Sequence, residues 1–498
     1  MFSKILVANR GEIAVRIMAT AREMGIGTVA VYSRGDSMSL HVLSADEAVL
    51  LGDSDPAESY LNADRIIAAA LDTGAEAIHP GYGFLSENPE FAAKVAAAGL
   101  AFIGPPAEVM AKLGNKTTAR RIMMEHGVPV IPGMISSESD PQRLATLAED
   151  LGFPVLVKAA AGGGGKGMRI VETMESLAES AELAASEALS AFGDGSVYLE
   201  KLLVRPRHVE FQILADAHGN VVHLFERECS IQRRHQKIIE ETPSPALHAE
   251  LREQMAAAAV TAARAAGYVN AGTVEFLVDQ SGNFYFLEVN TRLQVEHPIT
   301  EMTTGIDLVR RQLEVAAGLP LPFTQEEIVR RGHAIECRIY AEDPARDFMP
   351  SPGTILFCRT PEGPGVRYDH GIYPGFEIPV NYDPILGKLV VWAEDRPAAV
   401  NRMIRSLKEC AILGVSTPVE FLLDVVRSAA FRSGDTHTNF IDEHFSEWHP
   451  ESSAIETVLA AAAHEMTHSP ATRKLDGQPG DHPGISPWNT LGSWDLAR

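Results

Sequence analysis

The spacing of apolar residues changes along the chain, and this change constrains the fold more than any other feature. Up to about residue 115, short apolar runs (KILVA, TVAVYS, AEAIHP and AFIG) alternate with amphipathic stretches such as 12–24 and 61–72. That alternation predicts a parallel sheet whose strands are joined by helices. From residue 207 the apolar segments are longer and alternate with polar side chains, as in RHVEFQILAD, NVVHLFEREC, GTVEFLVD and NFYFLEVNTR. This second pattern predicts an antiparallel meander, with helices at about 247–266 and 305–317 beside it.

A run of four glycines, in AAAGGGGKGM at residues 159–168, lies between two apolar segments, PVLVKAA and MRIVE. The P-loop pattern G-x-x-x-x-G-K-[ST] fits Gly165 and Lys166 but fails at Ala160 and Gly167. A match to the dinucleotide pattern G-x-G-x-x-G carries little weight, because four consecutive glycines nearly guarantee it. We therefore predict a hairpin-like loop between two strands, whose backbone N–H groups bind phosphate oxygens. Lys158, on the strand before the loop, should consequently matter more than Lys166.

Composition excludes several classes of protein. The chain has 498 residues, of which 45% are hydrophobic and 22% charged, and no stretch approaches the ~18 apolar residues of a membrane span. The net charge of -23 argues against a nucleic-acid surface. The N-terminus reads as a first strand and not as a secretion signal, so a cytoplasmic protein is expected. Four scattered cysteines without a C-x-x-C pair favour reduced thiols.

Hard oxygen ligands recur at every second position of EVNTRLQVE, residues 288–296. On an extended strand, the side chains of Glu288, Asn290, Arg292, Gln294 and Glu296 would line one face. Such a face is usually only solvated, but carboxylates and amides at this spacing are ligands that Mg²⁺ prefers. Glu275, in the preceding strand, supplies a third carboxylate if the two strands pair across QSGN. We expect this face to hold the metal ions of a nucleoside triphosphate.

Positive charge is expected beside these carboxylates. Lys158 precedes the glycine run, Lys116 begins a helix as GNKTTAR, and residues 227–237 form a basic cluster with Gln232, His235 and Lys237. A lone surface lysine is usually solvated. Together with the carboxylate face, however, these cations favour a phosphate-binding site.

Many of these motifs, in the same order, resemble biotin carboxylase, an enzyme of the ATP-grasp fold. The resemblance rests on ILVANRGEIAVR, HPGYGFLSENPEFA, GNKTTAR, VLVKAAAGGGGKGMR, RHVEFQ, ERECSIQRRHQKIIEE, LEVNTRLQVEHPITE and HAIECRIYAEDP, and it runs from residue 3 to about 446. It implies an α/β and α+β architecture of three domains and a tail. These are a Rossmann-like N-terminal (pre-ATP-grasp) domain at 1–115, an ATP-grasp domain at 116–330 with a mobile glycine-rich B lid at about 132–203, a mixed C-terminal domain at 331–446, and a peripheral or partly disordered tail at 447–498.

The resemblance also assigns substrates and residues. ATP, with two Mg²⁺ or Mn²⁺ ions, and bicarbonate would carboxylate biotin through carboxyphosphate. The residues implied for ATP are Lys116, Lys158, the loop glycines Gly163, Gly164 and Gly165, Glu200, Lys201, Leu203, His208, Gln232, His235, Glu275 and Glu288. The metal ligands implied are Glu275, Glu288 and Asn290. Those implied for bicarbonate and biotin are Lys237, Arg292, Gln294, Val295, Glu296 and Arg338.

Four of these residues are implied to be catalytic. Glu296 would deprotonate bicarbonate, which Arg292 and the Val295 amide hold, and Lys237 would lie along the phosphates and the intermediate. Arg338 would stabilise the ureido oxyanion of biotin, although by itself a strand arginine is more often paired with a neighbour, here Glu336 or Glu342. No covalent thiol step is required, so Cys229, beside the basic cluster, is assigned to packing or substrate proximity.

Partners and alternatives follow from the same motifs. The chain has no Met-Lys or Lys-Met dipeptide, so a separate biotin carboxyl carrier protein is expected, together with carboxyltransferase subunits that choose the final acceptor, an acyl-CoA such as acetyl-CoA or a keto acid such as pyruvate. The family implies a homodimer, and we expect the tail to contact a partner subunit. His464 and His468 form an H-E-x-x-H pattern in that tail, but Pro470 follows at once and zinc is not expected. Two alternatives remain: another ATP-grasp ligase that joins a carboxylate to an amine or makes carbamoyl phosphate, and a catalytically silent nucleotide-binding subunit.

Overall fold

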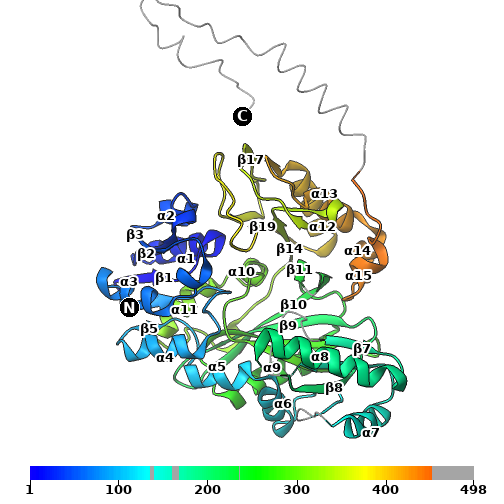
Figure 1. The fold of residues 1–498 in the computed structure, drawn as a ribbon. Coiled ribbons are helices and arrows are strands. Elements are labelled where there is room, and N and C mark those ends of the chain that lie inside the picture. Colours follow the sequence, from blue (N-terminus) through cyan, green and yellow to red (C-terminus); the bar gives the residue numbers. More distant parts are fainter. Residues whose placement is uncertain (135–139, 160–167, 194, 235, 451–498) are drawn as a thin grey trace, which may run out of the picture. The chain divides into compact units, whose positions relative to one another are not determined.

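The computed structural model describes residues 1–134, 140–159, 168–193, 195–234 and 236–450, and within it Met1–His449 form one compact unit (Figure 1). The glycine run, His235 and the tail from residue 451 lie outside the described residues. Among the described helices, none is long and apolar enough to cross a membrane.

A five-stranded parallel sheet begins the chain, in the order β3-β2-β1-β4-β5. Leu6 of β1 packs into one core while its neighbours Ile5 and Val7 pack into another, so both faces of the sheet are buried. The predicted Rossmann-like layout is confirmed. Its elements are β1 (Lys4–Val7), α1 (Gly11–Glu23), β2 (Gly27–Ser33), α2 (Leu40–Ser44), β3 (Glu47–Gly52), α3 (Ala63–Thr73), β4 (Ala77–His79), α4 (Pro89–Ala97) and β5 (Ala101–Phe102).

Two short helices, α5 (Ala107–Gly114) and α6 (Lys116–Glu125), lead out of this sheet. Asn115 separates them, and its side-chain oxygen accepts a hydrogen bond from the backbone N–H of Thr118 at 2.9 Å. This N-cap fixes the start of α6 at Lys116. The lysine is therefore held at a helix terminus.

The range expected for the lid contains a small three-stranded antiparallel sheet, β7-β6-β8, with α7 (Pro141–Leu151) and α8 (Leu177–Phe192), and this part is referred to below as the lid. Its strands are β6 (Val155–Ala159), β7 (Met168–Val171) and β8 (Val197–Lys201). Lys158 of β6 pairs with Met168 of β7, so residues 159–168 connect two neighbouring antiparallel strands. The two strands predicted on either side of the glycine run are confirmed, and the predicted loop itself lies outside the described residues.

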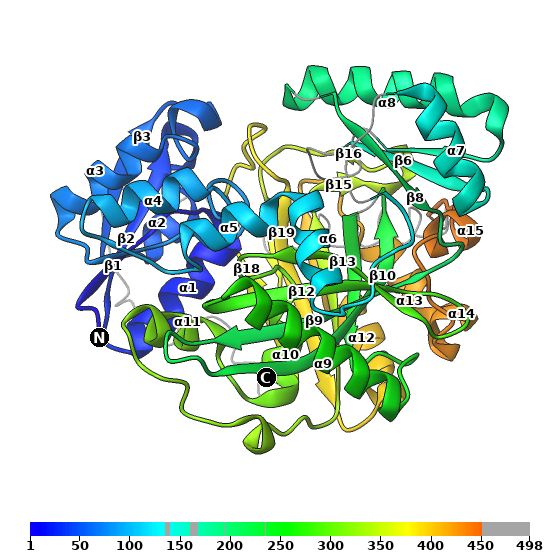
Figure 2. The same cartoon turned by 90° about the horizontal axis from the view of Figure 1, so that it is seen from below.

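An eight-stranded antiparallel sheet, β13-β12-β9-β10-β11-β14-β19-β18, carries most of the remaining chain. The predicted meander supplies β9 (Arg207–Ala215), β10 (Val221–Arg233), β11 (Gln236–Thr242), β12 (Asn270–Val278) and β13 (Phe284–Asn290). Figure 2 shows α9 (Ala249–Ala266) and α10 (His297–Thr304) beside these strands, and α11 (Leu308–Ala316) follows α10. Leu293, just after β13, is fully buried in a core shared with β1 and α1.

The large sheet continues into residues beyond 330, where we expected a domain boundary. β14 (His333–Tyr340) pairs with β11, and β19 (Ile385–Ala393) and β18 (Val366–His370) follow it. Helices and short strands complete this part of the chain: β15 (Glu342–Asp343), β16 (Met349–Pro350), β17 (Phe357–Arg359), α12 (Arg396–Glu409), β20 (Ala411–Leu413), α13 (Val419–Arg427), α14 (Ala429–Ser433) and α15 (Phe440–His444). Side chains from the ATP-grasp and C-terminal segments thus project from one sheet.

Candidate active site

A cavity of about 1080 Å³ lies against the large sheet and the lid, and the residues expected from the sequence line it wherever the structure describes them. These are Lys116, Lys158, Glu200, Lys201, Leu203, His208, Gln232, Lys237, Glu275, Glu288, Asn290, Arg292, Gln294, Val295, Glu296 and Arg338. Gly163, Gly164, Gly165 and His235 lie outside the described residues. The volume suits a nucleotide together with smaller substrates.

Two lysines bring positive charge to the lid side of this cavity. The Lys158 ammonium donates to Glu200 Oε2 at 2.8 Å, and Arg120 Nη1 donates to the other oxygen of Glu200 at 3.0 Å. Burial alone would lower the pKa of Lys158, but Glu200 outweighs it and the pKa is raised. Burial lowers the pKa of Lys116, with Glu288 opposing the shift. Both side chains are placed to meet an anion such as a phosphate.

Glu275 and Glu288 face each other across β12 and β13, as their pairing across QSGN predicted. The oxygens of Glu275 accept hydrogen bonds from Asn290 Nδ2 at 2.7 Å and Gln294 Nε2 at 2.8 Å, and His208 Nε2 lies 2.8 Å away. Glu288 has no side-chain hydrogen bond or ion pair within the described ranges. Burial, and next the charge of Glu275, raise the pKa of Glu288.

These carboxylates fit a divalent cation. Two opposed carboxylates with only partial compensation leave negative charge that Mg²⁺ would neutralise, and oxygen ligands are those it prefers. Glu288 can bind an ion without losing any existing partner, whereas Glu275 would exchange one of its hydrogen bonds. Asn290 Oδ1 already accepts from Arg292 Nη2 at 2.9 Å, so this oxygen would also have to be shared.

Lys237 stands at the centre of the remaining carboxylates. Its Nζ donates to Glu210 Oε2 at 2.5 Å, Glu275 Oε1 at 2.8 Å and Glu296 Oε1 at 2.7 Å. Burial would lower the pKa of Lys237, but the three carboxylates raise it well above its usual value. The lysine is therefore charged and fixes the positions of three acidic side chains from β9, β12 and the loop after β13.

Glu296 is held between two cations. Besides Lys237, Arg338 Nη2 donates to its second oxygen at 2.9 Å. Burial would raise the pKa of Glu296, yet Lys237 and Arg338 together hold the pKa well below its ordinary value. The carboxylate is ionised, and in this arrangement it is a weak base.

The prediction that residues 288–296 form one extended strand is wrong. β13 ends at Asn290, and the next residues form a loop that turns into α10, with Glu296 at its N-cap position. The turn buries Leu293 in the core, and it directs Gln294 toward Glu275 and Glu296 toward Lys237. The polar side chains therefore reach one cavity through a change of chain direction, and not through strand alternation.

Arg292 connects this site to the N-terminal domain. Its Nε donates to Glu87 Oε2 at 3.0 Å, on the segment between β4 and α4. The neighbouring Val295 accepts a hydrogen bond at its backbone oxygen from Lys388 Nζ, at 2.9 Å. Residues 292–295, which are predicted to hold bicarbonate, are therefore attached to the N-terminal domain through Glu87 and to β19 through Lys388.

The side chain of Arg338 binds neither Glu336 nor Glu342, the neighbours with which a surface strand arginine would pair. Its Nε donates to Glu240 Oε1 at 2.6 Å, and Glu342 binds Arg233 instead.

Cys229 is fully buried. Burial and next Glu210 raise the pKa of this thiol well above its usual value, which suits a packing role.

Two residues at the centre of the site, Glu210 and Arg227, were given no individual role by the sequence, although Arg227 begins the predicted basic cluster. Arg227 is fully buried, and it donates from Nε to Glu210 Oε1 at 2.6 Å and from Nη2 to Gln294 Oε1. The sequence did contain a signal for Glu210. One face of β9 carries polar side chains at every second position, where apolar residues would be expected: His208, Glu210 and Gln212. A fully buried arginine requires carboxylate partners.

Several apolar and neutral residues that line the cavity were also missed. Leu277 and Leu287 lie there with Thr438 and Asn439 from the segment before α15. The Thr438 amide donates to Pro206 O at 2.9 Å, which attaches that segment to the loop between β8 and β9. Strand alternation places Leu277 on the face of Glu275. No local pattern marks residues so distant in sequence as Thr438 and Asn439.

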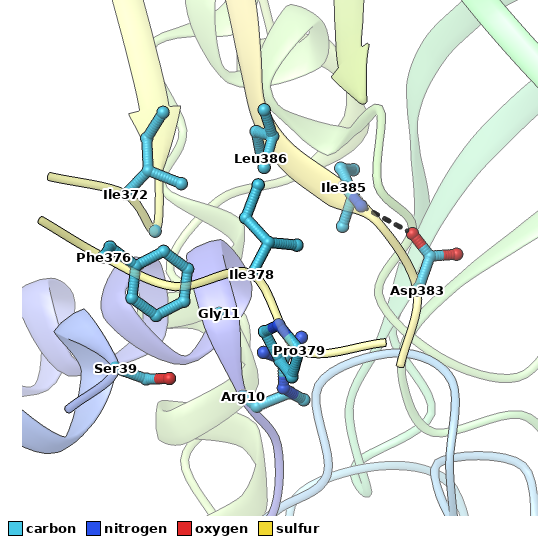
Figure 3. A pocket seen from close by; sticks show the side chains of 11 residues that line it. Arg10, Gly11, Ser39, Ile372, Phe376, Ile378, Pro379, Asp383, Ile385 and Leu386 are labelled. Carbon is cyan, nitrogen blue, oxygen red and sulfur yellow. Dashed lines mark hydrogen bonds between the residues drawn. The ribbon is translucent and has the colours of Figure 1, made fainter. Parts of the chain in front are cut away.

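Lys201 lines the cavity, but its ammonium donates to backbone groups outside it. Nζ donates to the backbone oxygens of Gly152 at 2.7 Å and Phe153 at 3.2 Å. Its backbone N–H donates to Pro132 O at 2.8 Å, so neither the ammonium nor this N–H is available to a ligand. A second cavity, of about 20 Å³, lies where Arg10 and Gly11 face Ile372, Phe376 and Ile378 (Figure 3). It has room for about one water molecule.

Sequence profiles of known families match most of the chain. The profile "Biotin carboxylase, N-terminal domain" matches residues 1–110, "Carbamoyl-phosphate synthase L chain, ATP binding domain" matches 115–324, and "Biotin carboxylase C-terminal domain" matches 336–443. Among curated proteins, a pyruvate carboxylase subunit from Methanothermobacter thermautotrophicus is 56% identical over 444 residues, which cover 89% of this chain and 90% of that protein. Biotin carboxylase of Nostoc sp. is 53% identical over 442 residues, covering 89% and 99%.

Solved structures agree. A biotin carboxylase from Campylobacter jejuni has a TM-score of 0.87 and 46% identity, and the match covers 89% of this chain and 99% of that one. The biotin carboxylase domain of 2-oxoglutarate carboxylase from Hydrogenobacter thermophilus, a dimer in complex with MgADP, ADP and bicarbonate, has a TM-score of 0.86 and 48% identity, covering 89% and 98%.

Proposed function

The chain belongs to the biotin carboxylase family, and on that premise we propose how its residues divide the reaction among ATP, bicarbonate and biotin. It is a ligase that uses ATP to carboxylate biotin with bicarbonate. The observation that carries the assignment of roles is Glu296, held between Lys237 and Arg338 in a cavity large enough for a nucleotide and smaller substrates.

ATP is proposed to bind with its phosphates toward Lys116 and Lys158. Phosphoryl transfer depends on positioning and on neutralising charge, and these two ammonium groups supply both. Glu275, Glu288 and Asn290 would hold Mg²⁺, and the ion would supply positive charge to offset the negative charge of the phosphates. Leu277 and Leu287 offer apolar contact to the adenine ring, beside the backbone of Lys201 and Leu203.

Bicarbonate is proposed to bind at Arg292, with the carboxylate of Glu296 as the acceptor of its proton. A bicarbonate oxygen attacks the γ-phosphorus, the bond to ADP breaks, and the proton passes to Glu296. The lowered pKa of Glu296 opposes this step. We infer that the bound anion draws Lys237 or Arg338 toward itself, because losing either cation would raise the pKa of Glu296 and make it a stronger base.

Carboxyphosphate formed in this way would break down to CO₂ and phosphate. The phosphate then takes the N1 proton of biotin, N1 attacks CO₂, and Arg338 stabilises the negative charge on the ureido oxygen. We propose that biotin arrives on a carrier protein, that carboxyltransferase subunits use the product, and that the protein works in the cytoplasm as a homodimer. The dimeric relative from Hydrogenobacter thermophilus supports the last of these.

ADP release tests this function. With ATP, Mg²⁺ and bicarbonate, free biotin should increase the rate of ADP release. If biotin has no effect while an amine substrate accelerates ADP release, the chain is another ATP-grasp ligase. If ATP binds and neither compound changes turnover, the catalytically silent alternative holds.

A further inference from the structure

Two glutamates face each other on neighbouring strands directly behind Arg338. Glu240 of β11 pairs with Glu336 of β14, and both side chains are fully buried. Directly opposite residues of an antiparallel pair project from the same face, with their Cβ atoms about 4.5–5.5 Å apart. Two negative charges at that distance, away from water, repel each other strongly.

The hydrogen bonds of this pair are incomplete. Glu240 Oε1 accepts from Arg338 Nε at 2.6 Å. Glu240 Oε2 and both oxygens of Glu336 are buried without a hydrogen-bond partner in the described part of the chain. A buried carboxylate oxygen without a donor is costly. A proton between the two carboxyl groups would supply a donor and remove the repulsion at once.

Neighbouring cations compensate Glu336 only in part, because Lys388 and Arg338 lower its pKa but both bind other groups. Lys388, on β19, is committed to Val295 O at 2.9 Å and lies 3.2 Å from Glu12 Oε1. Lys237, on β11, is shared among three other carboxylates. At the start of α10, Glu296 adds negative charge, and burial keeps the pKa of His297 well below its usual value, so this ring is neutral.

The titration of both carboxyl groups agrees with this arrangement. Burial and next the charge of Glu240 raise the pKa of Glu336 well above its ordinary value. Burial raises the pKa of Glu240 to about 7, because Arg338 offsets only part of the shift and Glu296 adds to it. The two groups titrate as a pair.

We propose that Glu336 and Glu240 share one proton, and that this pair positions Arg338 for the biotin step of the proposed reaction. With one proton, the pair carries a single negative charge that matches the guanidinium. Arg338 Nη2 then remains free to turn from Glu296 to the ureido oxygen. Loss of the shared proton would place a second negative charge on the pair. The pair would then attract the Arg338 guanidinium more strongly and keep it from the ureido oxygen, so the oxyanion would be stabilised less.

Two substitutions test the pair. Glu336→Gln keeps the shape and donates an N–H group to Glu240 without titrating, so kcat near neutral pH should stay within about threefold of the wild type. In the wild type, part of the fall in kcat at alkaline pH should come from loss of the shared proton. In Glu336→Gln this part of the fall should be absent. Glu336→Leu removes the donor, and a misplaced Arg338 should lower biotin-dependent kcat about tenfold or more. The KM for ATP and the ADP release without biotin should change little in either variant. Glu342→Gln, which alters a buried glutamate bonded to Arg233, serves as the matched control.

The infrared carbonyl band of a buried carboxylic acid gives a readout that does not depend on activity. Other buried glutamates with raised pKa values, such as Glu12 and Glu228, can also contribute to this band. The wild-type spectrum minus that of Glu336→Gln should therefore show the band in the pH range where the pair holds its proton. Absence of the band from this difference spectrum would overturn the proposal, as would equal kcat and pH profiles in Glu336→Gln, Glu336→Leu and the wild type. If the wild type itself shows no biotin-dependent turnover, the proposed function fails, and the infrared measurement still decides whether the proton is shared.

Discussion

Replacing Lys237 by methionine removes the cation that three buried carboxylates share. Glu210, Glu275 and Glu296 each lose a hydrogen bond of 2.5–2.8 Å, and their side chains are at most 4% exposed. Breaking a buried ion pair by removing one partner typically costs about 3–5 kcal/mol, because the remaining charge stays uncompensated. We expect Lys237→Met to lower the free energy of unfolding by about that amount at pH 8, measured by urea denaturation.

The loss should depend on pH with a definite sign. In the wild type, Lys237 holds the pKa values of Glu275 and Glu296 well below the ordinary value, against the effect of burial. Their stabilising contribution is therefore present above the unfolded pKa of about 4.3 and is lost as the pH falls through the lowered folded pKa. In the variant, burial without the lysine raises these pKa values. The carboxylates then destabilise the fold at neutral pH, and protonation relieves them as the pH falls.

The difference in stability between wild type and Lys237→Met should accordingly narrow from pH 8 to pH 5. Lys94→Met is the matched control, because Lys94 forms a surface ion pair with Asp64 and is 53% exposed. It should change stability little at any pH. If Lys237→Met loses no more stability than this control, or if its loss is the same at pH 8 and pH 5, the buried charge cluster does not act as described.

Three further changes address binding and chemistry. Lys158→Met should raise the KM for ATP about tenfold, the order expected for one lost contact to a charged group. Lys166→Met should raise this KM less. If steady-state kinetics show the larger increase for Lys166→Met, the role of Lys158 is contradicted. Glu288→Gln should raise the Mg²⁺ concentration for half-maximal turnover about tenfold or more, and a Mg²⁺ titration of Glu253→Gln, an exposed change on α9, should match the wild type. Glu296→Gln should lower kcat at least a hundredfold while ATP binding, measured by calorimetry, stays within about threefold; full activity would remove this residue from the mechanism.

The strand patterns predicted much of the fold. Alternation in the first 115 residues indicated the parallel sheet, and QSGN indicated the pairing that places Glu275 opposite Glu288. These features are local, so single segments reveal them. The family resemblance, carried by many motifs in order, supplied the roles of residues that no local pattern specifies, such as Arg338.

Other features depend on contacts between distant segments. The chain turns after Asn290 because Leu293 enters a core that β1 and α1 also form, and strand alternation cannot reveal that competition. Likewise, Arg338 leaves its strand neighbours for Glu240 and Glu296, which become available only when β14 pairs with β11. The roles assigned to individual site residues stay predictions until they are measured.

The fate of the bicarbonate carbon tests the proposed chemistry most directly. Radiolabelled bicarbonate is incubated with the protein, Mg²⁺ and biotin, and the label that becomes attached to biotin is counted with and without ATP. We predict ATP-dependent labelling of biotin in the wild type, with one ADP released for each label transferred, and almost none in Glu296→Gln. ADP release without label on biotin, or labelling that persists undiminished in Glu296→Gln, would contradict it.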